Sequence, residues 1–223
     1  MVNHRGKRTK PNARARTVSA LAVMLLALAG TTLSACADRP GARPPAAGRP
    51  VAVEPALLSA SALGADWAAG TTSVDGVRWP WAQEDCPGYR DGDFPAQRHR
   101  QAAAARQYLR TTPRAAALQV VEAYEPEWAG RALDDVRRVL LTCGSYPAYG
   151  GQVSFSLLDS DFAGDGALLV RGRIVTAEAP AAVSYFVVVR RGLVVSTLNL
   201  PDPGDESGAR AVAARLVEQL DRV

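Results

Sequence analysis

The sequence predicts an α+β fold, in which an antiparallel four-stranded (or larger) meander sheet packs against helices within a single domain. Changes in the spacing of apolar residues carry this prediction. Apolar residues recur at helical spacing between about residues 95 and 142, and they alternate with polar residues between 153 and 200. A helical pattern returns from about residue 205. Helices and strands that are segregated along the chain in this way favour an α+β architecture.

The first 35 residues have the pattern of a secretory signal peptide. A basic start precedes the apolar run 18–30, which is shorter than the roughly 20 residues of a spanning helix. The tetrapeptide Leu33-Ser34-Ala35-Cys36 resembles the lipobox of bacterial lipoproteins. We therefore expect cleavage before Cys36 and acyl chains, such as palmitate, on this residue, which together would hold the protein at the membrane. An ordinary signal peptide and an uncleaved anchor are the alternatives.

Removal of the signal peptide reverses the sign of the net charge. The full chain has 26 Lys and Arg against 22 Asp and Glu, a net charge of +4. Six of the cations and none of the acids precede Cys36, so the remainder has 20 cations against 22 acids and a net charge of −2. The basic character belongs to the targeting segment, and the charge gives no reason to expect nucleic acid as a partner.

A spacer and a single domain are expected after the anchor. Residues 37–55 hold five prolines among Ala, Gly and Arg, a composition that extends rather than folds. We assign residues 36–55 to the lipidated cysteine and its tether. Residues 56–223 are then one sensor-like α+β domain, long enough to bury a substantial core.

The first half of this domain is expected to be helical. Residues 57–63 predict a short helix and residues 64–93 a loop. The alanine run inside residues 95–110 favours a helix there, and Pro113 suits the first turn of a second helix that runs to about Tyr124. A third helix, over 132–142, places apolar residues close to one stripe, namely Leu133, Val136, Val139, Leu140 and Cys143.

Strands and a final helix are expected in the second half. Apolar residues alternate over 153–157, 168–174, 184–189 and 194–200, and Arg191-Gly192 predicts a tight hairpin turn. The helix from about Asp205 has an apolar side made of Val212, Leu216, Leu220 and Val223.

Two cysteines remain once Cys36 is acylated. An even pair in an oxidising compartment predicts a disulfide between Cys86 and Cys143. Closing a loop of this length would stabilise the fold by roughly 4 kcal/mol. A reactive thiol and a metal pair are the alternatives, although two thiols without neighbouring histidines make a poor zinc site.

Catalytic, cofactor and metal-binding patterns are not found in the sequence. His99 is the only histidine after the signal peptide, and we expect it on a solvated helix face. Residues 159–166 begin like a calcium loop, but Ala163 and Val170 occupy ligand positions, so a polar connection between strands is favoured. Arg190-Arg191 is expected to be a solvated basic turn, with contact to anionic lipid or wall polymer as the alternative.

Tryptophans are the main candidates for a binding site. Trp79-Pro80-Trp81, with Trp67 nearby in the sequence, could line an apolar or sugar-binding groove for a ligand. The alternative is that these rings cover one end of the helical layer and flank the disulfide.

Several segments resemble actinobacterial sensor-domain lipoproteins, which are similar to the extracellular domain of PknH-like serine/threonine kinases. The resemblance covers most of residues 56–223. It rests on Val121-Glu122-Ala123-Tyr124, Trp128-Ala129-Gly130-Arg131-Ala132-Leu133, Val136-Arg137-Arg138 with Cys143, Leu57-Leu58, Cys86, Gly164-Asp165-Gly166, Val187-Val188-Val189-Arg190 and Val194-Val195. It implies an α+β domain with a groove for an extracellular ligand. The kinase versions carry two disulfides, whereas this chain can form one, and it would need a partner to signal.

Three functions follow as hypotheses. The first is a non-enzymatic ligand-binding or sensor-like domain, lipid-anchored at the extracytoplasmic face of the cell membrane, that takes a small molecule, a lipid or a glycan. The second is an envelope structural or assembly factor that works through protein contacts. The third, and the least favoured, is a carboxylate-based cell-wall hydrolase.

Overall fold

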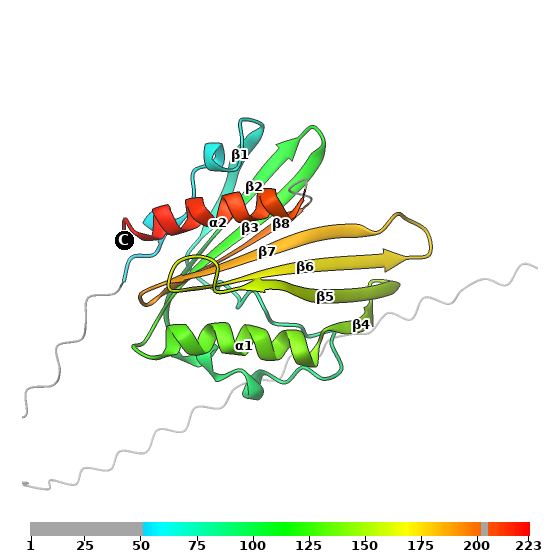
Figure 1. Cartoon of the computed structure of the whole chain (residues 1–223), viewed down its shortest axis with the longest axis horizontal. Coiled ribbons are helices and arrows are strands. Elements are labelled where there is room, and N and C mark those ends of the chain that lie inside the picture. The colour runs from blue at the N-terminus through cyan, green and yellow to red at the C-terminus, as the bar shows by residue number, and fades with distance from the viewer. Residues whose placement is uncertain (1–50, 202–204) are drawn as a thin grey trace, which may run out of the picture. The chain divides into compact units, whose positions relative to one another are not determined.

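An eight-stranded antiparallel sheet forms the centre of the protein in the computed structural model (Figure 1). The structure describes residues 51–201 and 205–223, so the predicted signal peptide, Cys36 and the tether up to residue 50 lie outside it. The strands are β1 (Trp67–Ser73), β2 (Arg100–Thr111), β3 (Arg114–Tyr124), β4 (Ser145–Ala148), β5 (Gly151–Ser160), β6 (Gly166–Thr176), β7 (Ala182–Arg191) and β8 (Val194–Pro201). The helices are α1 (Trp128–Thr142) and α2 (Glu206–Leu220), with short 3-10 turns at Glu54–Ala56, Ala60–Ala62, Asp91–Asp93 and Pro95–His99.

The sheet combines two meanders. Its order is β1-β2-β3-β8-β7-β6-β5-β4. Within β1 to β3, and again within β4 to β8, strands that follow one another in the sequence are neighbours in the sheet. Pairing of β3 with β8 joins the two meanders, and α1 carries the chain from β3 to the far edge at β4. The predicted meander is therefore confirmed for the second half of the chain, within a sheet of eight strands, which agrees with the expected four or more.

The two helices expected before α1 are wrong, because residues 100–111 and 114–124 form the hairpin β2–β3. Pro113 lies in the two-residue turn of this hairpin, between the paired residues Thr111 and Arg114. Val120 and Val121 point to opposite faces of the sheet and both are buried. A strand buried on both faces has a near-continuous apolar sequence, which periodicity cannot distinguish from that of a buried helix. The alanines favour a helix only by local propensity, and pairing within the sheet overrides it.

Other predicted elements agree with the structure. Helix α1, the strands β5 to β8 and helix α2 lie where the sequence placed them, and β7 and β8 turn at Arg191-Gly192. Two elements were missed: Trp67 begins strand β1, inside a segment expected to be a loop, and β4 follows α1 directly. Residues 57–63 form only a 3-10 turn instead of an α-helix.

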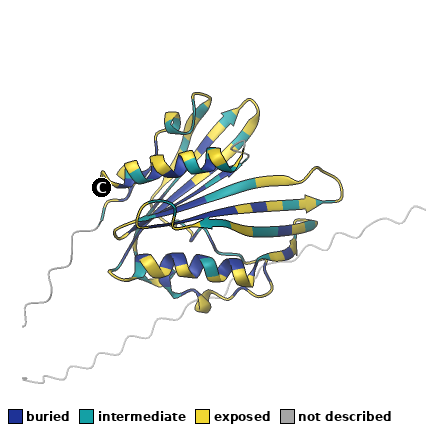
Figure 2. Ribbon diagram, in the orientation of Figure 1, coloured by how far each residue is buried: buried dark blue, intermediate teal, exposed yellow. Residues whose placement is uncertain are grey.

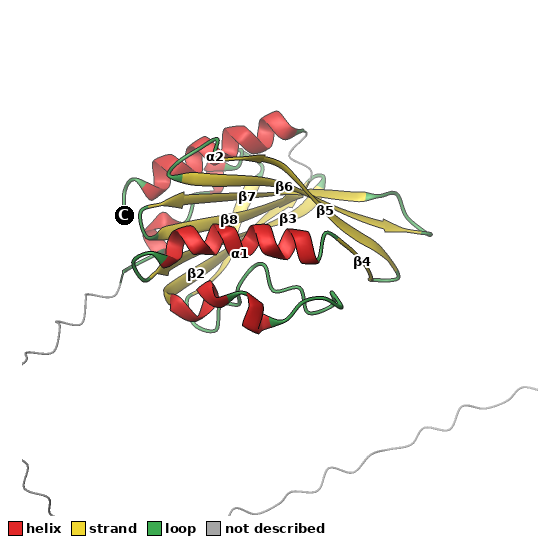
Figure 3. Cartoon of the chain, turned by 60° about the horizontal axis from the view of Figure 1, so that its bottom comes forward, coloured by secondary structure: helices red, strands yellow, loops and turns green. Residues whose placement is uncertain are grey.

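The sheet separates two hydrophobic cores. On β6 and β7, Leu169 and Val187 belong to the core under α2, whereas their neighbours Leu168 and Val188 belong to the core under α1. Figures 1 and 3 show the two helices on opposite faces of the sheet, and Figure 2 shows the buried stripe that each turns toward it. The period of two along each strand therefore supplies both cores at once. No helix in the described residues is long and apolar enough to cross a membrane.

A buried glutamine holds the start of the domain against the sheet. Gln119 Oε1 accepts hydrogen bonds from the backbone N–H of Leu58 at 2.9 Å and from the hydroxyl of Tyr108 at 2.8 Å. Its Nε2 donates to the carbonyl of Ala56 at 3.2 Å and to Ser196 Oγ at 3.0 Å. Val53 is also buried in this core, so the packed part of the chain includes residues 51–55, which we assigned to the tether.

Replacing Gln119 with leucine should destabilise the fold. Gln119→Leu leaves the backbone groups of Leu58 and Ala56 buried without partners, which we expect to cost about 2–4 kcal/mol in the free energy of unfolding. Urea denaturation followed by circular dichroism measures this loss. The control is Gln107→Leu on the neighbouring strand, where the side chain is exposed and the change should stay within about 0.5 kcal/mol. Equal stabilities of the two variants would contradict the role given to Gln119.

Candidate functional site

The three tryptophans proposed for a ligand groove do not form one. Trp79 and Trp81 are buried in the core under α1, with 5% and 1% of their surface exposed. Trp67 packs on the core at the opposite face of the sheet, where the guanidinium of Arg110 lies 5.0 Å from its ring centroid. The groove expected from these residues is therefore wrong, because the sheet separates Trp67 from the other two.

A pocket lies on the α1 face, next to the place that Trp81 fills. Its volume is about 210 Å³. We call it the aromatic pocket. Its lining includes four aromatic residues, Tyr146, Tyr149, Phe155 and Phe186, together with the polar residues Gln83, Ser184 and Asn199 and the charged Arg173. The ring of Phe186 packs against Trp81 at 5.2 Å and edge-on against Phe155 at 5.9 Å, measured between centroids. Trp81 thus supports the wall of the pocket from the buried side.

The register of the sheet brings these side chains together. Phe186 lies directly opposite Asn199 on β8, and Gly172 on β6 lies opposite both Phe155 and Ser184. A Cβ atom on Gly172 would come within 2.9 Å of Phe186 Cε2 and 3.1 Å of Ser184 Oγ. The glycine leaves the room that the two phenylalanine rings occupy, so the pocket depends on a position without a side chain.

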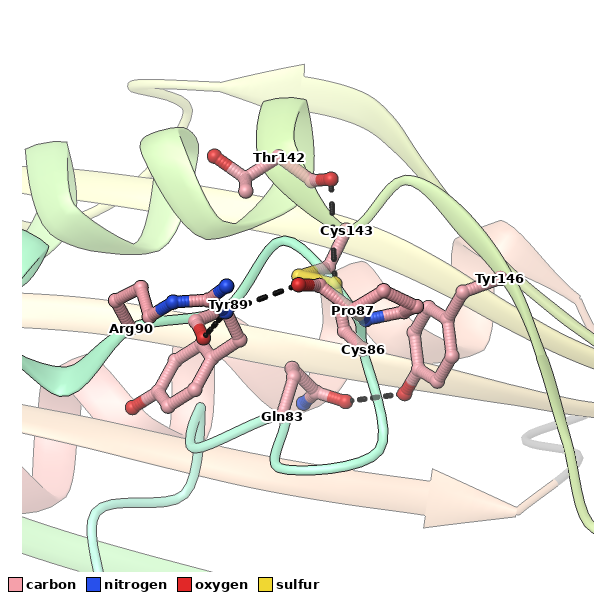
Figure 4. Close-up of a disulfide and its surroundings, with 8 residues drawn as sticks. All are labelled: Gln83, Cys86, Pro87, Tyr89, Arg90, Thr142, Cys143 and Tyr146. Carbon is pink, nitrogen blue, oxygen red and sulfur yellow. Dashed lines mark hydrogen bonds between the residues drawn. A yellow bond between two sulfur atoms is a disulfide. The ribbon is translucent and has the colours of Figure 1, made fainter.

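One polar atom of the pocket has no partner. Asn199 Oδ1 is buried and accepts no hydrogen bond within the described residues. A buried amide oxygen without a partner lowers the stability of the fold, because it has lost its hydrogen bonds to water and gained none from the protein. The polar wall opposite is ordered, because the hydroxyl of Tyr146 donates to Gln83 Oε1 at 2.6 Å (Figure 4). Burial raises the pKa of Tyr146, which keeps this hydroxyl a donor.

The disulfide predicted between Cys86 and Cys143 is present and holds this wall in place. It is buried at the end of α1, where it joins the loop before Cys86 to the start of β4. Gln83 and Tyr146 each lie three residues from one of its cysteines, and Figure 4 shows their hydrogen bond beside the sulfur atoms. The disulfide thus acts as a clamp on two segments that are far apart in the sequence.

A second clamp fixes the other end of the same loop. The buried carboxylate of Asp135 on α1 accepts a hydrogen bond from the backbone N–H of Ala96 at 2.8 Å and pairs with Arg138. The segment from Cys86 to Ala96, which follows Trp79 and Trp81, is thus attached at both ends, and its aromatic residues Tyr89 and Phe94 belong to the core under α1.

Several carboxylates in the described residues are used in ion pairs. Buried Glu122 pairs with Arg100 at 2.7 Å; burial raises its pKa, while Arg100 and the hydroxyl of Tyr124 act in the opposite direction. Asp165 and Asp221 share a surface hollow but both bind Arg191, which lies between them. The N–H of Gly192 and the Arg191 guanidinium lower the pKa of Asp165, so this carboxyl cannot act as a proton donor near neutral pH. These contacts do not favour a carboxylate-based hydrolase.

The acidic residues of segment 159–166, which begins like a calcium loop, also form ion pairs. Asp159 pairs with Arg210, Asp161 with Arg137, and Asp165 with Arg191. Among residues 51–201 and 205–223, no group of three or more His, Cys, Asp or Glu side chains is placed to hold a metal ion. Arg191 of the basic turn is thus ion-paired, and the segment 159–166 is a polar connection between β5 and β6.

The position of His99 differs from the one predicted. It does not lie on a solvated helix face but ends a 3-10 turn, where its ring stacks on Trp128 at 3.5 Å and its Nδ1 lies 2.9 Å from Glu125. The stacking fixes the turn against the start of α1, so His99 has a structural position remote from the aromatic pocket.

Sequence reasoning missed the residues that line the aromatic pocket. Phe155 and Phe186 were assigned to strands, but their meeting depends on which strands are neighbours and in which register. One signal was available in the segment Tyr146-Pro147-Ala148-Tyr149-Gly150-Gly151, where two tyrosines flank a turn directly after Cys143. Turns lie on the surface and often carry binding residues, so aromatic side chains at this turn were candidates for a site.

The fold is similar to that of a known extracellular domain. The crystal structure of the extracellular domain of PknH from Mycobacterium tuberculosis superposes with a TM-score of 0.53 and 17% sequence identity, covering 78% of this chain and 99% of that chain. No protein-family model matches the sequence, and no curated protein matches it significantly. The similarity to PknH-like sensor domains that the sequence motifs implied is thereby confirmed for the fold.

Removing the disulfide should loosen the wall of the pocket. For the double variant Cys86→Ser/Cys143→Ser we expect a loss of about 2–4 kcal/mol in the free energy of unfolding, because the unfolded chain gains freedom. Urea denaturation with and without reductant measures it. Reductant should bring the parent chain to the stability of the variant and leave the variant unchanged. A parent chain that is indifferent to reductant would contradict a stabilising disulfide.

Proposed function

We propose that this protein is a lipid-anchored, extracytoplasmic lipoprotein whose domain binds a ligand in the aromatic pocket without chemical conversion. The observation that carries the proposal is the unpartnered, buried Asn199 Oδ1 in a recess lined by four aromatic side chains. Binding sites are concave and largely apolar, with a few polar groups that orient the ligand. A donor group on the ligand would supply the hydrogen bond that Asn199 lacks in the free protein.

The fold and the sequence support the location and the class of the protein. The similar structure is an extracellular domain, and the chain carries a lipobox-like Cys36 after a signal-like segment. In this proposal the acyl chains on Cys36 insert into the membrane, and the proline-rich tether links this anchor to the domain. Such a sensor-like domain would pass on ligand binding through an envelope protein.

The attachment of the tether fits this arrangement. Val51 borders a surface hollow together with Arg191 and Gly192, at the turn between β7 and β8. The pocket residue Ser184 lies seven residues earlier on β7 than Arg191, which is roughly 23 Å along an extended strand. Val51 therefore lies near one end of β7, and the pocket residue Ser184 lies toward the other end of this strand.

A protein partner is the second candidate. Leu118, exposed, lies between Gln107 and Asn199 in the sheet, and Leu109 nearby on the same face is also exposed. Exposed leucines on a sheet face favour contact with another surface. This apolar area adjoins the aromatic pocket, so an envelope assembly factor would use the same face of the domain.

Replacing Asn199 separates binding from stability. Asn199→Leu removes a buried oxygen without a partner, so we expect the ligand-free protein to gain about 1 kcal/mol in the free energy of unfolding while it loses its ligand. The stability is measured by denaturation, and the ligand by mass spectrometry of molecules that co-purify with each protein.

The control is Thr197→Val on the same strand and the same face. Thr197 Oγ1 accepts the hydrogen bond of Trp81 Nε1 at 3.4 Å, so this change should destabilise the protein and leave the ligand bound. If small molecules co-purify equally with the parent and with Asn199→Leu, the aromatic pocket is not their site.

Replacing Cys36 tests the anchor. Cys36→Ala removes the thiol that would carry the lipid, so we expect the protein to leave the membrane fraction or to remain unprocessed. Membrane fractionation and the intact mass of the mature chain measure the outcome, with Cys86→Ser as the control for loss of a different cysteine. Unchanged mass and unchanged membrane association would contradict the lipid anchor.

A further inference from the structure

We infer that the aromatic pocket takes a single neutral sugar ring, with Tyr149 as the exposed wall on which that ring stacks. The inference rests on the proposed function and specifies its ligand.

Tyr149 is held in a conformation that tyrosine does not favour. It has φ = 53° and precedes Gly150, with φ = 70°, in the two-residue turn between the paired residues Ala148 and Gly151. Turns with two positive φ angles prefer Asn, Asp or Gly, and a bulky residue there is unusual. Its side chain is 71% exposed, so burial of the ring does not offset the strain. A strained residue at the edge of a pocket points to a role in binding.

Aromatic rings line the pocket on several sides. Tyr146 and Tyr149 come from the β4–β5 hairpin, while Phe155 and Phe186 come from the sheet itself. The face of a sugar ring carries C–H groups that stack on aromatic faces, and its rim carries hydroxyls. A volume of about 210 Å³ is below the roughly 300–1,000 Å³ of usual ligand sites, so the pocket fits one ring better than an extended chain.

The polar groups match hydroxyls rather than charges. Asn199 and Gln83 supply amides and Ser184 a hydroxyl, all of them neutral. Amides and hydroxyls can both donate and accept hydrogen bonds, as sugar hydroxyls do.

The charges near the pocket disfavour an acidic ligand. Arg173 also borders the pocket, but strand alternation turns its exposed side chain toward the opposite face, because its neighbours Gly172 and Ile174 face the pocket. At the edge, the carboxylate of Asp85 raises the pKa of the Tyr149 hydroxyl, so a negative charge lies beside the pocket. An anionic ligand would meet this charge, while the guanidinium of Arg173 is directed away from the pocket.

The experiment titrates the full chain with ring-shaped probes of one size. The neutral sugars are methyl α-D-mannopyranoside, N-acetylglucosamine and methyl α-D-glucopyranoside; glucuronate adds a charge, and cyclohexanol lacks the set of hydroxyls. Saturation-transfer NMR detects binding and a titration gives the affinity. We expect at least one neutral sugar to bind tenfold or more tightly than glucuronate and cyclohexanol.

Variants of Tyr149 supply the specific test. Tyr149→Asn relieves the backbone and removes the ring, so it should raise Tm by a few degrees and weaken sugar binding at least tenfold. Tyr149→Phe keeps the stacking ring and should retain the affinity. The matched control is Glu127→Asn, which relieves another exposed residue with positive φ (73°), at the start of α1. It should raise Tm and leave sugar binding unchanged.

The outcomes distinguish this inference from the proposed function. If glucuronate or cyclohexanol binds better than every neutral sugar, and Asn199→Leu weakens that binding, the sugar inference is wrong and the pocket stands as a ligand site. Equal sugar affinities of the parent chain and Tyr149→Asn would also overturn the stacking role. If no probe binds, and no ligand co-purifies with the parent chain, both the inference and the proposed function fail.

Discussion

The pairing of β3 with β8 is the contact on which the rest of the structure depends. It joins segments about 75 residues apart, with Leu118 opposite Asn199 and Val121 opposite Ser196. Without it the chain would form two separate meanders, each with an uncovered edge. With it the two halves become one sheet whose opposite faces are covered by α1 and α2, and Gln119 and Ser196 meet in the buried network that holds the start of the domain.

The aromatic pocket is a consequence of how α1 crosses that sheet. Helix α1 carries the chain from the centre to the far edge, so β4 and the tyrosines after it return beside the loop that contains Gln83. The disulfide and Asp135 then fix this loop to α1, and Trp81 fills the space behind Phe186. The walls of the pocket therefore come from four separate parts of the chain, held together by a few long-range contacts.

Two positions in this region are less stable than they could be. Asn199 keeps a buried oxygen without a partner, and Tyr149 keeps a positive φ that asparagine or glycine would adopt more readily. Residues that oppose stability mark sites where a ligand restores the missing interaction. The buried carboxylates Glu122 and Asp135 have the opposite character, since each is paired with an arginine, and they maintain the fold.

Local pattern determined much of this protein. Alternation fixed β5 to β8, helical spacing fixed α1 and α2, and the two cysteines of the domain fixed the disulfide, because each depends on a period or a pairing visible in the sequence. Tertiary structure decided the rest. Residues 100–124 form strands because they pair within the sheet, and burial of β3 on both faces hides its period in the sequence. Trp79 and Trp81 are part of the core under α1, and the sheet separates them from Trp67. The aromatic pocket depends on register across β5 to β8, where one residue of shift would turn Phe186 to the other face, and no local pattern specifies that register.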